Sequence, residues 1–515
     1  MDSTTNDAAW ERRGRSWWSH VRVLADDQME GRETGSPGYE RAAAYVTEQF
    51  RIAGLEPAGV EGYRQPVDLA VSTLDQGASS LTIVRDGATR SVRIPEEAQF
   101  IVTSATVSDI EADAVFVGYA LEIPEHGYSD LAGLDLREKI AVFVLGGPAD
   151  LPGPVRAHHQ SRSEVYRALR RAGAAGFVLV QNPSVPEAPW SRFASGQLFP
   201  RMELLGSDRG ERRPLPLTAA FDHEHLDLLF EGSGHRASEV LASLGKPGPL
   251  PRFPLAVRLR AHVEVRRSTA RCTNVVGVLP GSDPTLRHEY VVGTAHLDHL
   301  GIGEPIHGDS IYSGAMDNAS GVAALIEIAR AMKDAAERPR RSILFAAVTA
   351  EEQGLLGSEH FANHPTVSGP IVADLNMDMF LPLFPLRFVE VQGLDESTLG
   401  PTLRAAAHQV GVTADAEYLP DRKLFIRSDQ YSFVKTGVPA LMVSIGYARG
   451  SPEEQAVVAF LRDRYHAPAD DADQPVNLTA AAQFTDLLRR VILQVANDPG
   501  RPQWNPDSFF RRFAR

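Results

Sequence analysis

The pattern of apolar and polar residues changes along this chain and divides it into segments. Near the N-terminus, apolar residues recur every three or four positions over Trp17–Leu24 and again from Pro37 to Ala53, which predicts two helices. From about residue 70, short apolar runs alternate with turns, and LTIVRDGATRSVRI predicts a hairpin that turns at Asp86-Gly87. A strict alternation from Val257 to Val265 then predicts a long strand with one buried face. We therefore expect residues 71–264 to form a separate β-rich domain.

After this segment, apolar strands alternate with helices. The expected strands are NVVGVLPG, YVVGTA, SILFAAVTA, IVADLNMDMF and VPALMVS, and helical spacing covers Val322–Lys333, Leu403–Gln409 and Ala480–Ala496. Such alternation predicts an α/β fold, with a mixed, largely parallel sheet flanked by helices. Residues 1–70 and 265–515 are expected to form this domain together, so the β-rich domain is an insertion in it.

Composition narrows the classes of function. The 515 residues carry a net charge of −14, which argues against nucleic acid as the main partner because phosphate binding needs a basic surface. Cys272 is the single cysteine, so no intrachain disulfide can form. No apolar run is long enough for a transmembrane helix, and the first twenty residues lack the apolar core of a signal peptide. We expect a cytoplasmic protein unless a signal has been removed; the oligomeric state stays open.

Polar residues gather where the expected strands end. In a parallel α/β sheet the carboxyl ends of the strands form the site. His296 and Asp298 follow one strand, and alternation predicts that they point the same way, so the carboxylate can orient the imidazole. Glu351 and Glu352 follow another strand, and adjacent side chains of a turn point apart. One of this pair can bind a cation while the other handles protons.

The set as a whole indicates a metal site. The candidate ligands are three carboxylates and two histidines, namely Asp317, Glu352, Asp378, His296 and His466. So much negative charge in one place needs compensation, which a pair of divalent cations supplies. Histidine and carboxylate ligands suit Zn²⁺, with Mn²⁺ or Co²⁺ as alternatives. Two such ions sharing one carboxylate form a hydrolytic device that activates water.

Several motifs resemble those of the M28 family of zinc metallopeptidases. The motifs are HLDH at 296–299, GAMDNASG at 314–321, TAEEQGLLGSEHF at 349–361, NMDM at 376–379, SDQYSF at 428–433 and YHAPADD at 465–471. The segment LADDQMEGRETGSPGYERAAAYV at 24–46 resembles the N-terminal part of the same domain. Residues 71–264 resemble, more weakly, the protease-associated (PA) domain that many members carry as an insertion. The resemblance implies a zinc exopeptidase-like fold.

The resemblance also implies a role for each site residue. His296, Asp317 and Asp378 correspond to the ligands of one zinc, and Asp317, Glu352 and His466 to those of the other. Glu351 corresponds to the general base, Asp298 to the carboxylate behind His296, and Tyr465 to a tyrosine that polarises the scissile carbonyl. A cis peptide bond is expected at Asp317–Asn318.

Three functions remain open at this point. The first is an aminopeptidase that contains two zinc ions per chain and acts on peptide substrates. The second is an exopeptidase of the glutamate carboxypeptidase type, which needs a cation for the substrate's carboxylate; Arg427 is a candidate. The third is a non-catalytic binding protein on the same fold, and the presence of every ligand and of the base argues against it.

Overall fold

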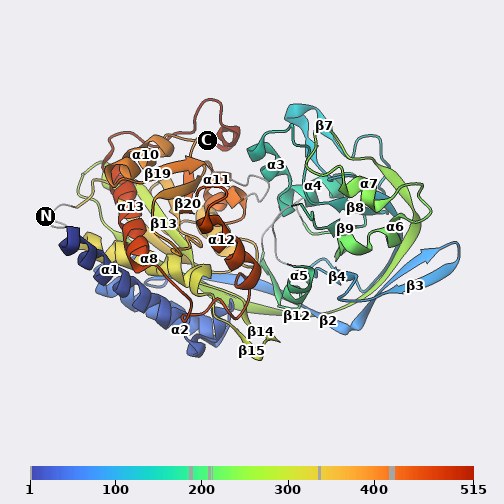
Figure 1. Cartoon of the computed structure of the whole chain (residues 1–515), viewed down its shortest axis with the longest axis horizontal. Coiled ribbons are helices and arrows are strands. Elements are labelled where there is room, and N and C mark those ends of the chain that lie inside the picture. The colour runs from blue at the N-terminus through green and yellow to red at the C-terminus, as the bar shows by residue number, and fades with distance from the viewer. Residues whose placement is uncertain are drawn as a thin grey trace. The chain divides into compact units, whose positions relative to one another are not determined.

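The computed structural model describes residues 3–184, 189–206, 210, 213–333, 338–416 and 424–514. Within this part of the chain, two compact units are present (Figure 1). The first contains the N-terminal segment up to Asp68 and the chain from Arg271 onward, and the second contains Leu69–Ala270. That the first unit is a peptidase-like domain and the second a PA-like insertion in it stays a prediction.

A mixed sheet forms the centre of the first unit. Its strands lie in the order β19, β18, β20, β17, β13, β16 and the C-terminal part of β12. They span Thr413–Ala416, Phe388–Gln392, Ala440–Gly446, Ile371–Asn376, Tyr290–His296, Ser342–Val348 and Phe253–Leu279, in that order. Strands β16, β13, β17 and β20 are parallel, whereas β12 and β18 run antiparallel to their neighbours β16 and β20. The predicted mixed, largely parallel sheet is confirmed.

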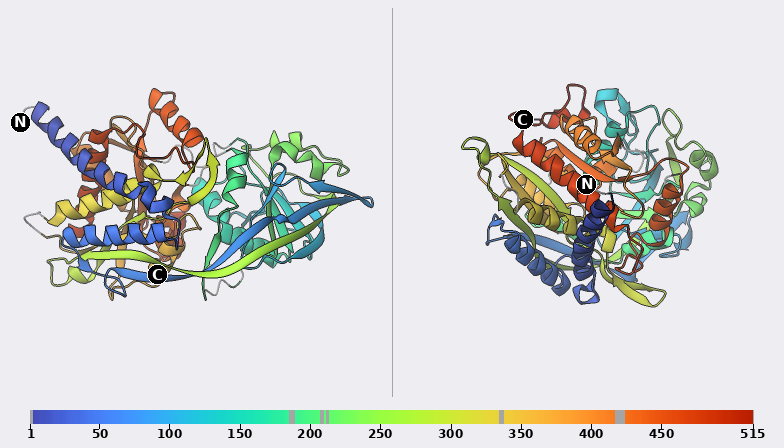
Figure 2. Two further views of the ribbon diagram at one scale, coloured as in Figure 1. Left: turned by 90° about the horizontal axis from the view of Figure 1, so that it is seen from below. Right: turned by 60° about the vertical axis from the view of Figure 1, so that its left-hand side comes forward.

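Helices cover both faces of this sheet, which explains why its central strands are apolar throughout. Gly293 of β13 lies against Leu325 of α8 (Ser320–Lys333) and Ile492 of α13 (Leu478–Asn497), while Val292 belongs to a core cluster with residues of other helices. Those helices are α9 (Leu356–Asn363) and α11 (Gln430–Lys435). Helix α1 (Ser3–Leu24) contacts α8 and α13 (Figure 2). The sheet is therefore buried on both faces.

The remaining elements of the first unit lie around this core. They are α2 (Pro37–Ile52), α10 (Leu399–Gln409), α12 (Pro452–Asp463), β1 (Glu56–Pro57), and the hairpin of β14 (Gly301–Ile306) and β15 (Asp309–Tyr312). The predicted start of α2 is confirmed: Ser36 accepts a hydrogen bond from the backbone N–H of Tyr39, and Pro37 occupies the first helical turn. The first helix is longer than the apolar spacing indicated, because α1 begins at Ser3.

The second unit contains a further group of strands. Strands β5 (Asp109–Phe116), β8 (Ile140–Val144), β9 (Gly176–Val180) and β11 (Leu217–Phe221) are parallel, and β4 (Ala98–Phe100) and the N-terminal part of β12 are antiparallel to the outer two. The hairpin at Asp86-Gly87 joins β2 (Arg64–Arg85) to β3 (Ala88–Val92), as predicted. Strands β6 (Glu122–Ile123), β7 (Tyr128–Ser129) and β10 (Arg201–Leu204) are short.

Short helices accompany these strands in the second unit. They are α3 (Gly153–His159), α4 (Arg162–Arg171), α5 (Trp190–Gly196), α6 (Asp227–Phe230) and α7 (Ala237–Leu241). Tyr166 and Leu169 of α4 pack in a core cluster with Phe143 of β8 and Phe177 of β9. The expected strand at Val257–Val265 is part of β12, which continues without a break through the expected strand NVVGVL. No helix in the described segments has the length and hydropathy needed to span a bilayer.

Candidate metal centre

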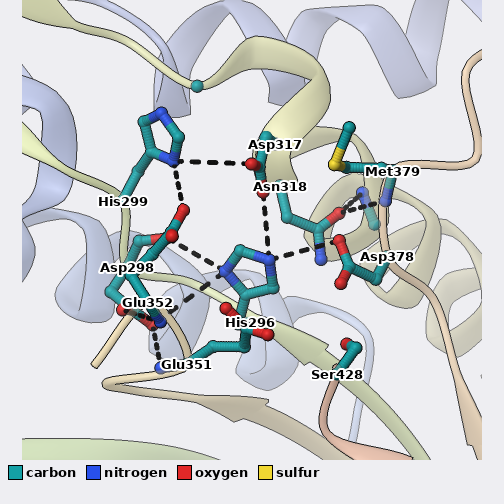
Figure 3. A network of polar contacts seen from close by, with 12 residues as sticks. His296, Asp298, His299, Asp317, Asn318, Glu351, Glu352, Asp378, Met379 and Ser428 are labelled. Carbon is teal, nitrogen blue, oxygen red and sulfur yellow. Dashed lines mark hydrogen bonds and ion pairs between the residues drawn. The ribbon is translucent and has the colours of Figure 1, made fainter. Parts of the chain in front are cut away.

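The candidate ligands come from the carboxyl ends of neighbouring parallel strands. His296 is the last residue of β13, and it lies opposite Val348, the last residue of β16. Glu351 and Glu352 follow β16 directly, and Asp378 follows β17. Because these strands are adjacent and parallel, their ends meet at one edge of the sheet and bring the side chains together, as Figure 3 shows.

Asp317 is positioned by an irregular turn rather than by a strand. It lies in the π-helical turn Ala315–Ala319, which precedes α8, and the peptide bond to Asn318 is cis, as the resemblance implied. The Asn318 side chain donates a hydrogen bond to the Met377 carbonyl at 2.8 Å and accepts one from the backbone N–H of Gly321 at 2.9 Å. The turn is thus tied both to the end of β17 and to the first turn of α8.

The two oxygens of Asp317 face two different sets of ligands. Oδ1 lies 3.2 Å from Nε2 of His296, which in turn lies 3.3 Å from Oδ1 of Asp378. Oδ2 lies 3.2 Å from Nε2 of His466, which lies 3.4 Å from Oε2 of Glu352. The five residues that the sequence singled out as ligands are therefore adjacent to one another, with Asp317 between the two groups.

His466 and Tyr465 come from the segment that follows α12. His466 has a positive φ of 54° and keeps 28% of its side chain exposed, whereas His296 is buried. The ring of Tyr465 lies beside the His466 ring, with 3.9 Å between the centroids. The tyrosine is half-buried, so its side chain lies at the accessible edge of the cluster.

Asp298 lies beside the cluster, but its contacts differ from those expected. Because β13 ends at His296, strand alternation does not extend to Asp298, and its Oδ1 lies 4.0 Å from Nδ1 of His296. The backbone carbonyl of Asp298 is closer to that nitrogen, at 3.1 Å. The carboxylate instead accepts hydrogen bonds from the backbone N–H groups of Glu351 and Glu352, at 3.1 and 3.3 Å, and from Thr34 at 3.2 Å. Asp298 therefore fixes the turn that carries both glutamates.

The site also contains His299, which the sequence analysis passed over. Its Nδ1 lies 2.8 Å from Oε1 of Glu352, the oxygen that does not face His466, and its ring is buried. The signal was present in the motif HLDH, where a second histidine follows a candidate ligand by three positions. Only the fold reveals its partner, because Glu352 follows a different strand.

The carboxyl groups of the cluster have pKa values shifted in opposite directions. Burial alone would raise the pKa of Asp317, but its contacts with His296 and His466 outweigh burial and hold the pKa well below its usual range. Burial raises the pKa of Glu351 well above its usual range; the charge of His296 opposes this, and the nearby carboxylates of Asp378 and Glu352 add to it. Two adjacent glutamates thus have different environments, which shift their pKa values in opposite directions.

A second group of donor side chains lies in the other unit, and two of its members have partners of opposite type. His158, His159 and Glu164 come together at α3 and α4, and the two histidines end helix α3. His159 contacts Glu125 at 2.9 Å, and Glu164 forms an ion pair with Arg167.

Part of the first unit matches a known protein family. The sequence model of Peptidase family M28 matches residues 274–492, and this range contains every candidate ligand. Leupeptin-inactivating enzyme 1 of Streptomyces exfoliatus is 30% identical over 228 residues, which are 42% of this chain and 47% of that protein. A probable glutamate carboxypeptidase VP8 of Zea mays is 25% identical over 67% of this chain and 47% of its own length. The chain spans less than half the length of the curated relatives it matches.

Solved structures agree at the level of the fold. An aminopeptidase from Aneurinibacillus sp. strain AM-1 superimposes with a TM-score of 0.58 at 19% identity, covering 98% of this chain and 99% of that one. A zinc aminopeptidase from Bacillus subtilis gives a TM-score of 0.50 at 19% identity, covering 94% and 97%. The matched region is thus similar to peptidase family M28, and the solved structures show the same fold.

Proposed function

We propose that this chain is an aminopeptidase that uses two zinc ions to remove N-terminal residues from peptides. The observation that carries the proposal is the position of Asp317, whose two carboxylate oxygens face two separate histidine–carboxylate pairs. A carboxylate placed in this way can bridge two cations, and a pair of cations suits hydrolysis of an amide bond.

The residues present fit the metal. The donors are imidazole nitrogens and carboxylate oxygens, which zinc prefers, and the ligand atoms of His296, Asp317 and Asp378 all lie within 4.8 Å of one another. These three residues would hold one ion, and Asp317, Glu352 and His466 would hold the other. Bound zinc would supply a Lewis acid for the carbonyl oxygen and a water of lowered pKa. Mn²⁺ or Co²⁺ would suit the same donors.

Glu351 has the properties of a general base. It belongs to neither ligand set, yet it lies within the group formed by His296 and Glu352. A base in this reaction must take a proton from water, keep it, and pass it to the leaving amine. A carboxyl group whose pKa is raised by burial keeps such a proton well. Asp298 assists indirectly, because it holds the backbone N–H groups of both glutamates.

Tyr465 is proposed to contact the substrate. Its ring packs against His466, so its position is tied to a ligand, and the residue is half-buried at the edge of the cluster. A phenol O–H at such a place can donate a hydrogen bond to the scissile carbonyl, which strengthens as negative charge develops on that oxygen. The surplus of carboxylates beside the ligands suits the free ammonium group of a peptide.

A second candidate is an exopeptidase that recognises the substrate's C-terminal carboxylate. One observation favours it: the positive charge of Arg427 acts on His466, so a guanidinium group lies within electrostatic reach of the ligands. The Zea mays relative is named a probable glutamate carboxypeptidase, whereas an Aspergillus fumigatus relative is named a probable leucine aminopeptidase 2. The names therefore leave it to be tested whether this chain cleaves from the N-terminus or from the C-terminus of its substrate.

The test compares substrates that differ in one terminal group. Zinc-loaded protein is given a tripeptide with both termini free, the same peptide acetylated at its N-terminus, and the same peptide amidated at its C-terminus. We expect acetylation to remove most turnover and amidation to have little effect. The Glu351→Gln variant, purified in the same way, controls for contaminating peptidases. Loss of turnover on amidation would identify a carboxypeptidase, and a zinc-loaded protein that cleaves none of the peptides would favour a binding protein.

A further inference from the structure

The segment between α1 and α2 contacts the loops that carry the candidate ligands His296 and Asp317. It contains the short helical turn Asp27–Arg32, and Glu33 then forms an isolated parallel bridge with His299. Glu30, Gly31 and Arg32 all have positive φ angles, of 50°, 64° and 51°. Two of these residues are not glycine, and such a conformation is retained only where surrounding contacts stabilise it. The contacts of the Arg32 side chain supply that stabilisation.

The guanidinium group of Arg32 is fully buried and donates hydrogen bonds to four backbone carbonyls. Nε donates to Leu297 at 2.9 Å and Nη2 to Gly314 at 2.9 Å, while Nη1 donates to both Ser313 and Leu24 at 2.6 Å. Leu297 lies next to His296, and Ser313 and Gly314 precede the turn that carries Asp317. One side chain therefore joins the two loops that carry the shared aspartate and the buried histidine.

The charge of Arg32 also matters at this position. The negative groups that act on it are Asp470, Asp298, Asp317 and Glu352, and they oppose the effect of burial, which lowers its pKa to about 10. The group is still a cation at neutral pH. Its positive charge therefore offsets part of the repulsion among these four carboxylates.

We propose that Arg32 is a positioning residue for the metal centre, which holds the His296 and Asp317 loops in the geometry that binds zinc before the metal arrives. The inference rests on the proposed function, since it concerns the same centre. Arg32 contacts backbone carbonyls and no ligand atom, so it acts through the two loops and not on the substrate. Outer groups that orient metal ligands typically change metal affinity by about 10–100-fold.

The test uses Arg32→Lys and Arg32→Gln in the full chain. Lysine keeps the charge, but its single ammonium group cannot reach four carbonyls in the fork geometry of a guanidinium. Zinc affinity is measured by competition with a chromophoric chelator, and the stability of the metal-free proteins by thermal melting. We expect zinc affinity about 10–100-fold weaker for Arg32→Lys, and weaker again for Arg32→Gln, which also loses the charge.

Arg341→Lys is the matched control. Arg341 is also fully buried, donates to the carbonyls of Val495 and Asp498 and pairs with Glu289, but it precedes β16 and so lies at the opposite end of that strand from the glutamates. We expect this control to melt at a lower temperature with zinc affinity within about twofold of the original protein, since it touches no ligand loop.

The outcomes separate the two proposals. If the unaltered protein binds no zinc, the proposed function fails and the inference falls with it. If the unaltered protein binds zinc and Arg32→Lys binds it equally well, the proposed function stands and the inference is overturned. An Arg32→Lys protein that does not fold even with excess zinc would assign Arg32 to folding of the domain and would also overturn it.

Discussion

Oδ2 of Asp470 accepts a hydrogen bond of 3.0 Å from the backbone N–H of Asp317. The same carboxylate accepts the N–H of Met316, and its own backbone carbonyl accepts the N–H of Ala315 at 2.9 Å. Asp470 thus acts as a cap for the turn that presents the shared aspartate, and it is buried. Its position four residues after His466 links two parts of the centre that are far apart in the sequence.

Replacing Asp470 by alanine should destabilise this turn. Two buried N–H groups would lose their acceptor, and each unsatisfied group costs about 1–3 kcal/mol, so we expect the free energy of unfolding of the first unit to fall by about 2–6 kcal/mol. Asp470→Asn, which keeps one carbonyl oxygen, should lose less. Chemical unfolding of both variants without metal checks this. Equal stability of the alanine variant and the original protein would contradict it.

Replacing Glu351 by glutamine should remove catalysis and leave the metal in place. The amide has nearly the size of the acid but cannot accept the proton of the water, and loss of a general base costs about 10²–10⁴ in rate. The loss should fall on kcat rather than KM. Steady-state kinetics beside metal analysis make the measurement. A fully active variant would mean that another group accepts the proton.

Replacing Glu352 by alanine, in contrast, should remove metal from the protein. Its carboxylate lies between His466 and His299, and both contacts disappear in the variant. We expect about one bound ion per chain instead of two, because one ligand set loses a donor. Metal analysis after dialysis measures the ratio, with Glu351→Gln as the comparison. If Glu352→Ala retains the metal and Glu351→Gln sheds it, the two roles are reversed.

Removing the metal should abolish activity reversibly. The five ligands should bind two divalent ions per chain, and a strong chelator should bring turnover to the background level. Zinc added back should restore it, and acid should release the metal because histidine ligands bind only in their neutral form. Elemental analysis of active protein gives the stoichiometry. Less than one ion per active chain would exclude the two-metal arrangement.

An ion cluster in the second unit predicts a pH-dependent contribution to stability. The buried Glu97 accepts hydrogen bonds from Arg90 and Arg93, at 2.8 and 2.9 Å, and these contacts lower its pKa from 4.5 to about 2. A carboxyl whose pKa is lower in the folded state stabilises the protein above its ordinary pKa, and this contribution is lost as the pH falls towards about 2.

Glu97→Gln tests this contribution. Both arginines are substantially exposed, at 43% and 64%, so solvent screens the pair. We expect the variant to be less stable by about 1–2 kcal/mol at pH 7, with the difference shrinking steadily between pH 4.5 and pH 2. Urea unfolding of both proteins across this range measures the difference. A difference that is independent of pH would show that packing, rather than charge, stabilises the cluster.

The sequence identified the residues that cluster in the candidate metal centre because chemistry and strand position coincided. Each of Glu351, Glu352 and Asp378 follows an apolar run that forms a parallel strand, so the rule that sites lie at carboxyl ends of strands brought them together. Asp317 was identified through its motif at the start of α8. The apolar runs also predicted the core strands of the mixed sheet, since burial on both faces leaves a continuous apolar signal.

What escaped prediction depends on contacts between distant segments. His299 and Arg32 are polar residues in loops, and no periodicity indicates that one contacts Glu352 and the other binds the carbonyls of Leu297 and Gly314. The orientation of Asp298 was predicted from strand alternation, which does not apply after β13 ends. The unbroken course of β12 was missed because its exposed middle, from Glu264 to Arg271, interrupts the apolar pattern.

The order of the ligands along the chain has a consequence for how the protein matures. His296 is the first ligand to be synthesised and His466 the last, and Asp317 needs both the end of β17 and the Asp470 cap in place. A nascent chain that lacks the segment from His466 onward would therefore offer zinc only part of the proposed set of donors. On the proposed function, a complete zinc site therefore requires that the first unit has been assembled.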